Sequence, residues 1–170
     1  RLTGYDPDAA AARRLSELGG TPLGSPIEVV ASCRRLIWSL PGPAQVRDTV
    51  AALEPVVESG AFILDTTTGD PSDVESHAAR FAARGVSYLD CEIGGSSLQT
   101  ASGEAIVICG GDAEAIAGCQ EILAAISSRV FHTGPAGTGT RMKLALNIAI
   151  GLHRAVLAED KVEQRGGKPT

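Results

Sequence analysis

Residues 134–147 read Gly134-Pro-Ala-Gly-Thr-Gly-Thr-Arg-Met-Lys-Leu-Ala-Leu-Asn147, and this stretch decides the fold because it joins a glycine-rich turn to a long apolar segment. The glycines loosen the turn, and Thr138 or Thr140 is expected to cap the start of a helix. Lys143 and Asn147 stand four residues apart, so a helix places their ammonium and amide groups on one face. An amine placed there can take a proton from an alcohol and return it, whereas the plainer interpretation is a solvated lysine on a capped helix.

The composition indicates a globular protein with a substantial core. The chain has 170 residues, of which 44% are hydrophobic, and this length suits one domain or one domain with part of a second. A net charge of −5 without a basic tract argues against a nucleic-acid partner. The longest apolar run, 144–158, is interrupted by polar residues, so we expect no membrane span.

The cysteines and histidines argue against a metal site and against a disulfide scaffold. The chain has only three histidines, and its cysteines form no Cys-x-x-Cys pair. Scattered thiols are typical of a reducing compartment, so we expect a cytoplasmic protein without a bound metal. The cysteines are Cys33, Cys91, Cys109 and Cys119.

Segments with strand character alternate with segments of helical periodicity along the whole chain. Glycine, proline and polar residues separate them. The alternation predicts an α/β, Rossmann-like fold, with a mostly parallel sheet, helices on both of its faces, and the start of a long helix at the end. We expect strands at 2–5, 35–40, 61–64, 86–89, 104–109 and 130–132, and helices at 7–18, 27–31, 44–58, 72–83 and 113–127.

Polar residues follow several of the predicted strands, at the edge where ligands bind in sheets of this kind. Asp6 follows the first strand, and its carboxylate can accept hydrogen bonds from both hydroxyls of a ribose and repel a 2′-phosphate. Asp6 can equally be the N-cap of the next helix, with Pro7 at the first helical position. The other polar strand ends are Ser39-Leu40-Pro41, Asp65–Thr68 and Gly94–Ser96.

Taken in order, these motifs resemble the β-hydroxyacid dehydrogenases, the group that includes 3-hydroxyisobutyrate dehydrogenase and 6-phosphogluconate dehydrogenase with its NAD-binding domain. The most specific match is Gly134-x-x-Gly-x-Gly-x-x-x-Lys143-x-x-x-Asn147, which is similar to the family's catalytic motif at full spacing. The resemblance covers nearly the whole chain. The other matching segments are Leu40-Pro41, Asp65-Thr66-Thr67-Thr68 (similar to Asp-x-Ser-Thr), Leu89–Ser96 (similar to Asp-Ala-Pro-Val-Ser-Gly-Gly) and Gly103–Gly111.

The resemblance implies an NAD(P)-dependent oxidoreductase that transfers hydride between a nicotinamide cofactor and a small hydroxy acid. It implies that Lys143 is the general acid/base and that Asn147 binds the substrate near the reacting carbon. The substrate carboxylate is expected at Gly94, Gly95 and Ser96, through backbone N–H groups and a hydroxyl. The residues expected along the cofactor are Asp6, Leu40, Pro41 and Thr68.

The chain also departs from the family pattern. The substrate segment reads Gly-Gly-Ser96 where Ser-Gly-Gly is usual, and Glu92 replaces a proline, which adds a negative charge near the carboxylate site. Members that use NADP often have Asn-Arg at the position of Asp6, so the expected cofactor is NAD rather than NADP. The chain begins at what resembles the family's second strand, without the Gly-x-Gly-x-x-Gly loop that cradles the pyrophosphate.

These departures suggest a piece of a longer enzyme. We expect a truncated dinucleotide-binding domain at residues 1–133, and residues 134–170 as the catalytic turn and the start of the interdomain helix of a missing helical domain. After Glu159 the sequence is polar and glycine-rich. The helix at 142–157 is apolar on more than one face, which predicts a homodimer or a swapped assembly. Whether the given chain is active by itself stays open.

Three alternatives also stay open. The glycine-rich turn resembles the phosphate loop of nucleotide triphosphatases, but Thr140 and Arg141 stand where that loop needs a lysine and a magnesium-binding hydroxyl. A Rossmann-like domain without its glycine loop can be a non-catalytic dimerisation or ligand-binding module. The third alternative is an imine reductase, a relative on the same fold that usually has a different residue at the position of Lys143.

Overall fold

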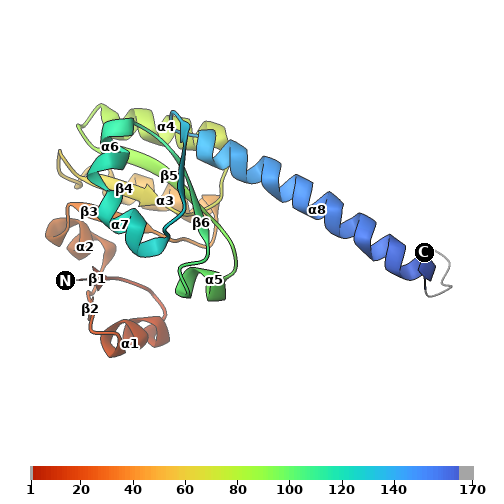
Figure 1. The fold of residues 1–170 in the computed structure, drawn as a ribbon. Coiled ribbons are helices and arrows are strands. Elements are labelled where there is room, and N and C mark those ends of the chain that lie inside the picture. Colours follow the sequence, from red (N-terminus) through yellow and green to blue (C-terminus); the bar gives the residue numbers. More distant parts are fainter. Residues whose placement is uncertain (1, 165–170) are drawn as a thin grey trace.

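The computed structural model describes residues 2–164, and the side chains of residues 2–159. A small parallel sheet pairs β1 (Thr3–Gly4) with β2 (Thr21–Pro22), and α1 (Ala9–Glu17) connects these two strands (Figure 1). A sheet of five strands follows, in the order β3-β4-β5-β6-β7. Its strands are β3 (Arg35–Trp38), β4 (Phe62–Asp65), β5 (Ser87–Gly94), β6 (Ile106–Gly110) and β7 (Val130–Gly134).

The five-stranded sheet is parallel except where β5 meets β6. Residues 95–105, with the short helix α5 (Ser97–Ala101), are all that separates these two strands. A connection of this length is too short for a parallel crossover, so β6 returns antiparallel to β5. The predicted α/β fold with a mostly parallel sheet is confirmed. The other helices of this body are α2 (Pro26–Ser32), α3 (Pro43–Leu53), α4 (Pro71–Ala82), α6 (Ala113–Gly118) and α7 (Gln120–Ile126).

Helices cover both faces of the sheet, and each face has its own hydrophobic core. Successive strand residues point to opposite faces. Ile63 and Tyr88 therefore lie in the core with α3 and α4, whereas Leu64 and Leu89 lie in the core with α6 and α7. Complete burial of a large side chain such as Phe81 stabilises the fold by roughly 1.5–3 kcal/mol. The sheet is thus a rigid platform for the loops at its edges.

Side-chain caps explain where several helices begin. Ser25 caps α2, Asp70 caps α4 and Asp112 caps α6, each by accepting a hydrogen bond from a backbone N–H of the first turn. Proline stands in the first turn of α2, α3 and α4, where its missing N–H has no cost. These local signals are readable in the sequence, and the helix expected at 27–31 corresponds to α2.

Asp6 is not the N-cap of α1, so this alternative for Asp6 is wrong. The structure places Asp8 at the N-cap, where its carboxylate accepts a hydrogen bond from the N–H of Ala10 at 2.8 Å. Asp6 instead accepts a hydrogen bond from the N–H of Asp8 at 2.8 Å, in the turn that leads into the helix. Both aspartates flank Pro7, and the one that follows the proline is the cap.

Some element boundaries also differ from the prediction. The strand expected at 86–89 continues to Gly94, because residues 90–94 pair with β6. The helix expected at 44–58 ends at Leu53, two residues before Pro55, which has no N–H to continue the helical hydrogen bonds. The helix expected at 113–127 divides at Cys119, directly after Gly118. The short elements β2 and α5 were not predicted.

Helix α8 (Thr138–Gln164) has 27 residues and extends away from the body of the protein (Figure 1). Its beginning contacts β5, β6, β7 and α4. The helix is longer than the predicted 142–157 and passes through Glu159; the last part of the predicted polar tail, residues 165–170, lies outside the described residues. Within residues 2–164, no helix is long and apolar enough to cross a membrane. The exposed large apolar side chains of α8 are Met142, Leu144, Ile148, Ile150, Leu152, Val156 and Leu157.

Candidate functional site

The loops that follow β3 and β4 are joined by hydrogen bonds at one edge of the sheet. The backbone N–H and the hydroxyl of Thr66 both donate to the carbonyl of Trp38, each at 2.8 Å. The N–H of Leu40 donates to the hydroxyl oxygen of Thr67 at 3.0 Å. These bonds bring the predicted cofactor residue Leu40 next to the segment that contains Thr68. Pro41 and Thr68 are exposed at this edge.

Asp65 shapes the loop after β4 from inside the protein. Its side chain is buried, accepts the N–H of Thr67 at 2.9 Å, and accepts the hydroxyl of Tyr88 at 2.5 Å. Burial raises the pKa of Asp65, and burial together with the adjacent Asp65 raises the pKa of Tyr88. Both carboxyl oxygens of Asp65 therefore serve the fold, and the loop presents Thr68 to the outside.

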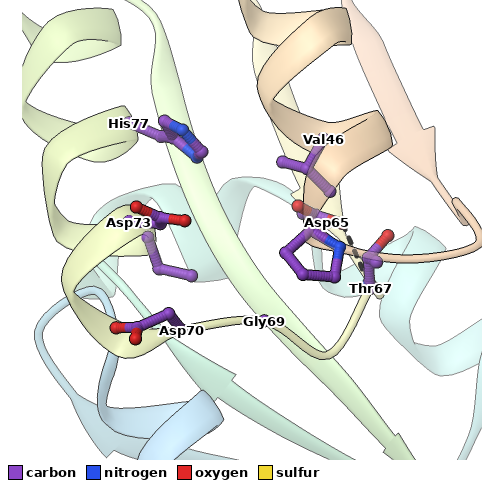
Figure 2. Close-up of a pocket in the computed structure, with 9 residues that line it drawn as sticks. Val46, Asp65, Thr67, Gly69, Asp70, Asp73 and His77 are labelled. Carbon is purple, nitrogen blue, oxygen red and sulfur yellow. Dashed lines mark hydrogen bonds between the residues drawn. The ribbon is translucent and has the colours of Figure 1, made fainter.

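A small cavity lies beside Asp65, between α3 and the beginning of α4 (Figure 2). Its volume is about 10 Å³, enough for about one water and far too small for a cofactor. His77 on α4 lines it and is buried, and its Nδ1 has no hydrogen-bond partner within the part of the chain that the structure describes. Burial lowers the pKa of His77, so the neutral ring is favoured at pH 7.

Three polar side chains follow one another on one face of β5. Tyr88, Asp90 and Glu92 alternate with Leu89 and Cys91, and all of them are buried. The alternation follows from the two-residue period of a strand. Each polar side chain reaches a different element: Tyr88 bonds to β4, Asp90 to the beginning of α8, and Glu92 to both α8 and the loop after β4.

Asp90 caps helix α8 from the neighbouring strand. Its Oδ1 accepts the N–H of Gly137 at 2.9 Å, and its Oδ2 accepts the N–H of Thr140 at 2.8 Å. A carboxylate here satisfies backbone donors and complements the positive end of the helix dipole. The predicted cap by Thr138 or Thr140 is wrong: Thr138 is the first helical residue, and its hydroxyl donates to the carbonyl of Pro135 at 2.7 Å.

The glycines of the opening stretch allow α8 to approach the sheet closely. Gly137 has φ +87°, a conformation that favours glycine. A Cβ atom at Gly139 would lie 2.9 Å from the N atom of Gly110 and 2.9 Å from the carbonyl oxygen of Ile108. These neighbours are backbone atoms of β6 and cannot move aside cheaply. The glycine at 139 therefore fixes the distance between the start of α8 and the sheet.

Lys143 lies where α8 passes the end of β5. Its side chain is half-buried, and its Nζ donates to the carbonyl oxygen of Ile93 at 2.5 Å. The structure thus brings the candidate acid/base next to the segment predicted to bind substrate. Asn147 stands one helical turn further along α8 and is exposed.

The substrate segment is partly engaged in local structure. Gly94 ends β5, and Gly95 follows with φ +150°. Ser96 caps α5: its hydroxyl oxygen accepts the N–H of Gln99 at 3.2 Å, and its own N–H donates to the Gln99 side chain at 2.8 Å. The displacement of the serine within the family pattern therefore coincides with a helix-capping function.

Asp6 stands apart from the other predicted cofactor residues. It follows β1, which belongs to the two-stranded sheet, whereas Leu40, Pro41 and Thr68 follow strands of the five-stranded sheet. Asp6 is exposed. Its carboxylate is thus accessible at the end of a parallel strand, as a ribose ligand requires.

Lys143 lines neither of the two described cavities. The wider one has a volume of about 440 Å³ and lies beside β7 and the start of α6, where His132 and Pro135 contribute to its wall. Lys143 lies instead beside the end of β5, and Asn147 is exposed one helical turn further along α8. Among the residues that the structure describes, no cluster of histidine, cysteine or carboxylate side chains is suited to hold a metal ion, and the four cysteines are free thiols.

Sequence reasoning missed the connection between the loops and the helix. Asp90 and Thr140 were not among the predicted site residues, and Glu92 was noted only as a departure from the family pattern. The available signal was the alternation of Tyr88, Asp90 and Glu92 with apolar residues, which is typical of a strand with one polar face. The buried partners of these side chains come from distant segments.

The chain matches a known family over most of its length. The sequence model for the NAD binding domain of 6-phosphogluconate dehydrogenase matches residues 1–134.

Two curated relatives and one solved structure illustrate the similarity. The chain is 31% identical over 156 residues to L-threonate dehydrogenase of Cupriavidus necator. The aligned region covers 86% of this chain and 51% of that protein. It is 30% identical over 169 residues to 3-sulfolactaldehyde reductase of Escherichia coli, which covers 94% of this chain and 56% of that protein. The chain therefore spans about half the length of these relatives. The fold is similar to that of Mycobacterium tuberculosis 3-hydroxyisobutyrate dehydrogenase with L-serine, with a TM-score of 0.90, 23% identity, and coverage of 98% of this chain and 58% of that one.

Proposed function

Because the chain belongs to the family of the NAD binding domain of 6-phosphogluconate dehydrogenase, we propose that it is the cofactor-binding part of an NAD(P)-dependent dehydrogenase or reductase of the β-hydroxyacid type. The proposed reaction transfers hydride between a nicotinamide and a small hydroxy acid. The names of the relatives support this reaction type, since one is a dehydrogenase of L-threonate and the other a reductase of 3-sulfolactaldehyde. We also propose that residues 1–133 bind the dinucleotide and that residues 134–170 lead into a second domain.

The observation that carries the proposal is the position of the Lys143 amine. The amine hydrogen-bonds to the backbone at the end of β5, and Asp90 fixes the start of the helix that carries it. A half-buried amine held by a capped helix is suited to exchange a proton with a substrate hydroxyl. The plainer interpretation of a fully solvated lysine does not account for the contact with Ile93.

We propose that the dinucleotide binds at the edge of the sheet where β3 and β4 end. Exposed groups follow adjacent parallel strands there, and we propose that Leu40, Pro41 and Thr68 contact the cofactor, with Asp6 on a ribose and NAD favoured over NADP. When bound, the nicotinamide supplies the chemistry of hydride transfer. In the oxidation of the substrate, Lys143 holds the hydroxyl and takes its proton. Asn147, one turn further along the helix, orients the same oxygen or its neighbour.

Substrate binding is proposed at the turn that follows β5. Gly94 and Gly95 offer backbone N–H groups to a carboxylate, and Ser96 stands at the start of α5 beside them. A homodimer and a cytoplasmic location complete the proposal. The exposed apolar side chains of α8 support the first, and the free thiols support the second.

The test is a panel of small 2- and 3-hydroxy acids, offered to the complete protein with NAD and separately with NADP. Reduction of the nicotinamide is followed by its absorbance. We expect turnover of at least one hydroxy acid, faster with NAD, and no hydrolysis of ATP with magnesium. Binding of NADH without turnover of any acid or aldehyde would favour a non-catalytic ligand-binding module, and ATP hydrolysis would favour the phosphate-loop alternative.

A further inference from the structure

Glu92 is completely buried between two hydroxyl groups. Its Oε2 accepts a hydrogen bond from the hydroxyl of Thr68 at 2.6 Å, in the loop after β4. Its Oε1 lies 3.1 Å from the hydroxyl oxygen of Thr140, in the first turns of α8. Across the sheet, the residue paired with Glu92 is the apolar Ile108 of β6. The side chain therefore joins the predicted cofactor loop to the helix that carries Lys143.

The hydroxyl of Thr140 has more acceptors than it can serve. Its oxygen lies 3.1 Å from Oδ2 of Asp90 and 3.1 Å from Oε1 of Glu92. A hydroxyl has one hydrogen to donate, although it can also accept. If both carboxyls were ionised, one of these two short contacts would join two acceptors without a hydrogen between them. A single additional proton, on one of the two carboxyls, makes both contacts proper hydrogen bonds.

The surroundings of the two carboxyls decide where that proton resides. Each oxygen of Asp90 already accepts a backbone N–H at the start of α8, from Gly137 and from Thr140, and an N–H group can only donate. Glu92 has hydroxyl partners, which can accept a hydrogen bond as well as donate one, and burial raises its pKa more than the hydrogen bonds with Thr68 and Thr140 lower it. Asp90 on the same strand favours the neutral form of Glu92, whereas the charge of Lys143 on α8 favours the ionised form. The Nζ of Lys143, however, hydrogen-bonds to the carbonyl of Ile93.

We propose that Glu92 carries a proton at neutral pH in the folded protein and donates it to Thr140, which completes a hydrogen-bonded chain from Thr68 through Glu92 and Thr140 to Asp90. This row of hydrogen bonds then has one donor for every contact. It connects the loop after β4 with the start of α8, and so sets the position of Lys143 relative to the predicted cofactor site. This positioning function rests on the proposed function, whereas the protonation of Glu92 does not.

Infrared spectroscopy of the complete protein tests the proton directly, without any assay of activity. The difference spectrum of wild type minus Glu92→Gln at pH 7 should contain the carbonyl band of a protonated carboxylic acid. The same difference for Glu104→Gln, an exposed glutamate, should lack that band. Absence of the band from the Glu92 difference would overturn the proposal, whatever the protein catalyses.

The pH dependence of stability gives a second measurement. Folding raises the pKa of this carboxyl above its ordinary value of 4.5. The resulting stabilisation is fully present below pH 4.5, and it is lost as the pH rises towards the pKa in the folded state. The ratio of the unfolding constants of wild type and Glu92→Gln should therefore rise, by up to about tenfold per pH unit, above pH 4.5. Glu104→Gln should show no such rise. A ratio that is constant or falls with pH would contradict the proposal.

Kinetics then separate positioning from mere structural support. Glutamine at position 92 can accept from Thr68 and donate to Thr140 as the neutral acid does, so Glu92→Gln should keep kcat within about threefold of wild type. Glu92→Leu should lower kcat by tenfold or more with little change in the affinity for NADH, because the loop and the helix lose their connection. A Glu92→Gln variant as slow as Glu92→Leu would show that an ionised glutamate is needed.

Discussion

Single buried polar residues determine the shape of the loops at the edge of the sheet. Asp65 is the clearest case, because it accepts both the N–H that turns the loop and the hydroxyl of Tyr88. A buried acceptor that loses a donor retains the cost of its desolvation. The loop that presents Thr68 thus depends on a tyrosine from the neighbouring strand.

Tyr88→Phe removes that hydroxyl with almost no change in shape. We expect the free energy of unfolding to fall by about 1–3 kcal/mol, since Asp65 then lacks one buried hydrogen bond. Urea denaturation measures this difference. Tyr5→Phe is the matched control, because Tyr5 is exposed and should change stability by less than about 0.5 kcal/mol. Equal effects of the two substitutions would show that the Tyr88–Asp65 bond contributes nothing.

At the scale of elements, local patterns in the sequence predicted the order of strands and helices but not the extent of β5. The strands at 35–38, 62–65 and 106–110 fall within or beside the expected ranges, because apolar runs bounded by glycine and proline are local signals. The strand was expected to end at Leu89. It continues to Gly94 because residues 90–94 pair with β6, and the buried carboxyls of Asp90 and Glu92 find their partners on α8, in a distant segment.

In the candidate site, too, local features could be predicted from the sequence, whereas contacts between distant segments could not. The positions of Lys143 and Thr68 beside strand ends could be predicted from strand order and family resemblance, since both depend on the sequence of elements. The cap of α8 by Asp90 and the bridge through Glu92 could not, since both arise when distant segments meet inside the protein. The capping function of Ser96 was also hidden, although Ser96 and Gln99 have the spacing of a capping box.

For two glycines of α8, we expect substitution by alanine to change the stability in opposite directions. Gly139→Ala places a methyl group against the backbone of β6 and should lower the stability by roughly 1–3 kcal/mol. Gly151→Ala meets no neighbour within 4 Å and should raise the stability of the helix by about 0.5–1 kcal/mol. Thermal unfolding of the two variants compares them directly. If Gly139→Ala stabilises as well, α8 does not pack closely against β6.

At the scale of the whole molecule, α8 extends beyond the sheet (Figure 1). It exposes large apolar side chains on more than one of its faces. Ile148 and Leu152 stand four residues apart on α8 and are each 65% exposed, and adjacent exposed apolar side chains are typical of an interaction surface. Contact with a second copy would cover part of this surface. The arrangement supports the proposed homodimer.

Sedimentation of the complete protein checks this expectation. Wild type should sediment as a dimer, and Ile148→Glu with Leu152→Glu should weaken the dimer by at least tenfold, because charged groups would have to be buried. Leu98→Glu is the control, since Leu98 is 80% exposed on α5, outside α8. A wild-type protein that stays monomeric at all concentrations would rule the dimer out.

The most direct test of the account is the rate of hydride transfer after Lys143→Ala in the complete protein, with the affinity for NADH measured in parallel. Loss of a general acid/base should reduce the rate by about 10²–10⁴-fold and leave NADH binding nearly unchanged. Lys143→Arg should be similarly slow, because a guanidinium keeps the charge but does not release its proton. A Lys143→Ala variant that transfers hydride at close to the wild-type rate would contradict the assignment of Lys143 and the mechanism built on it.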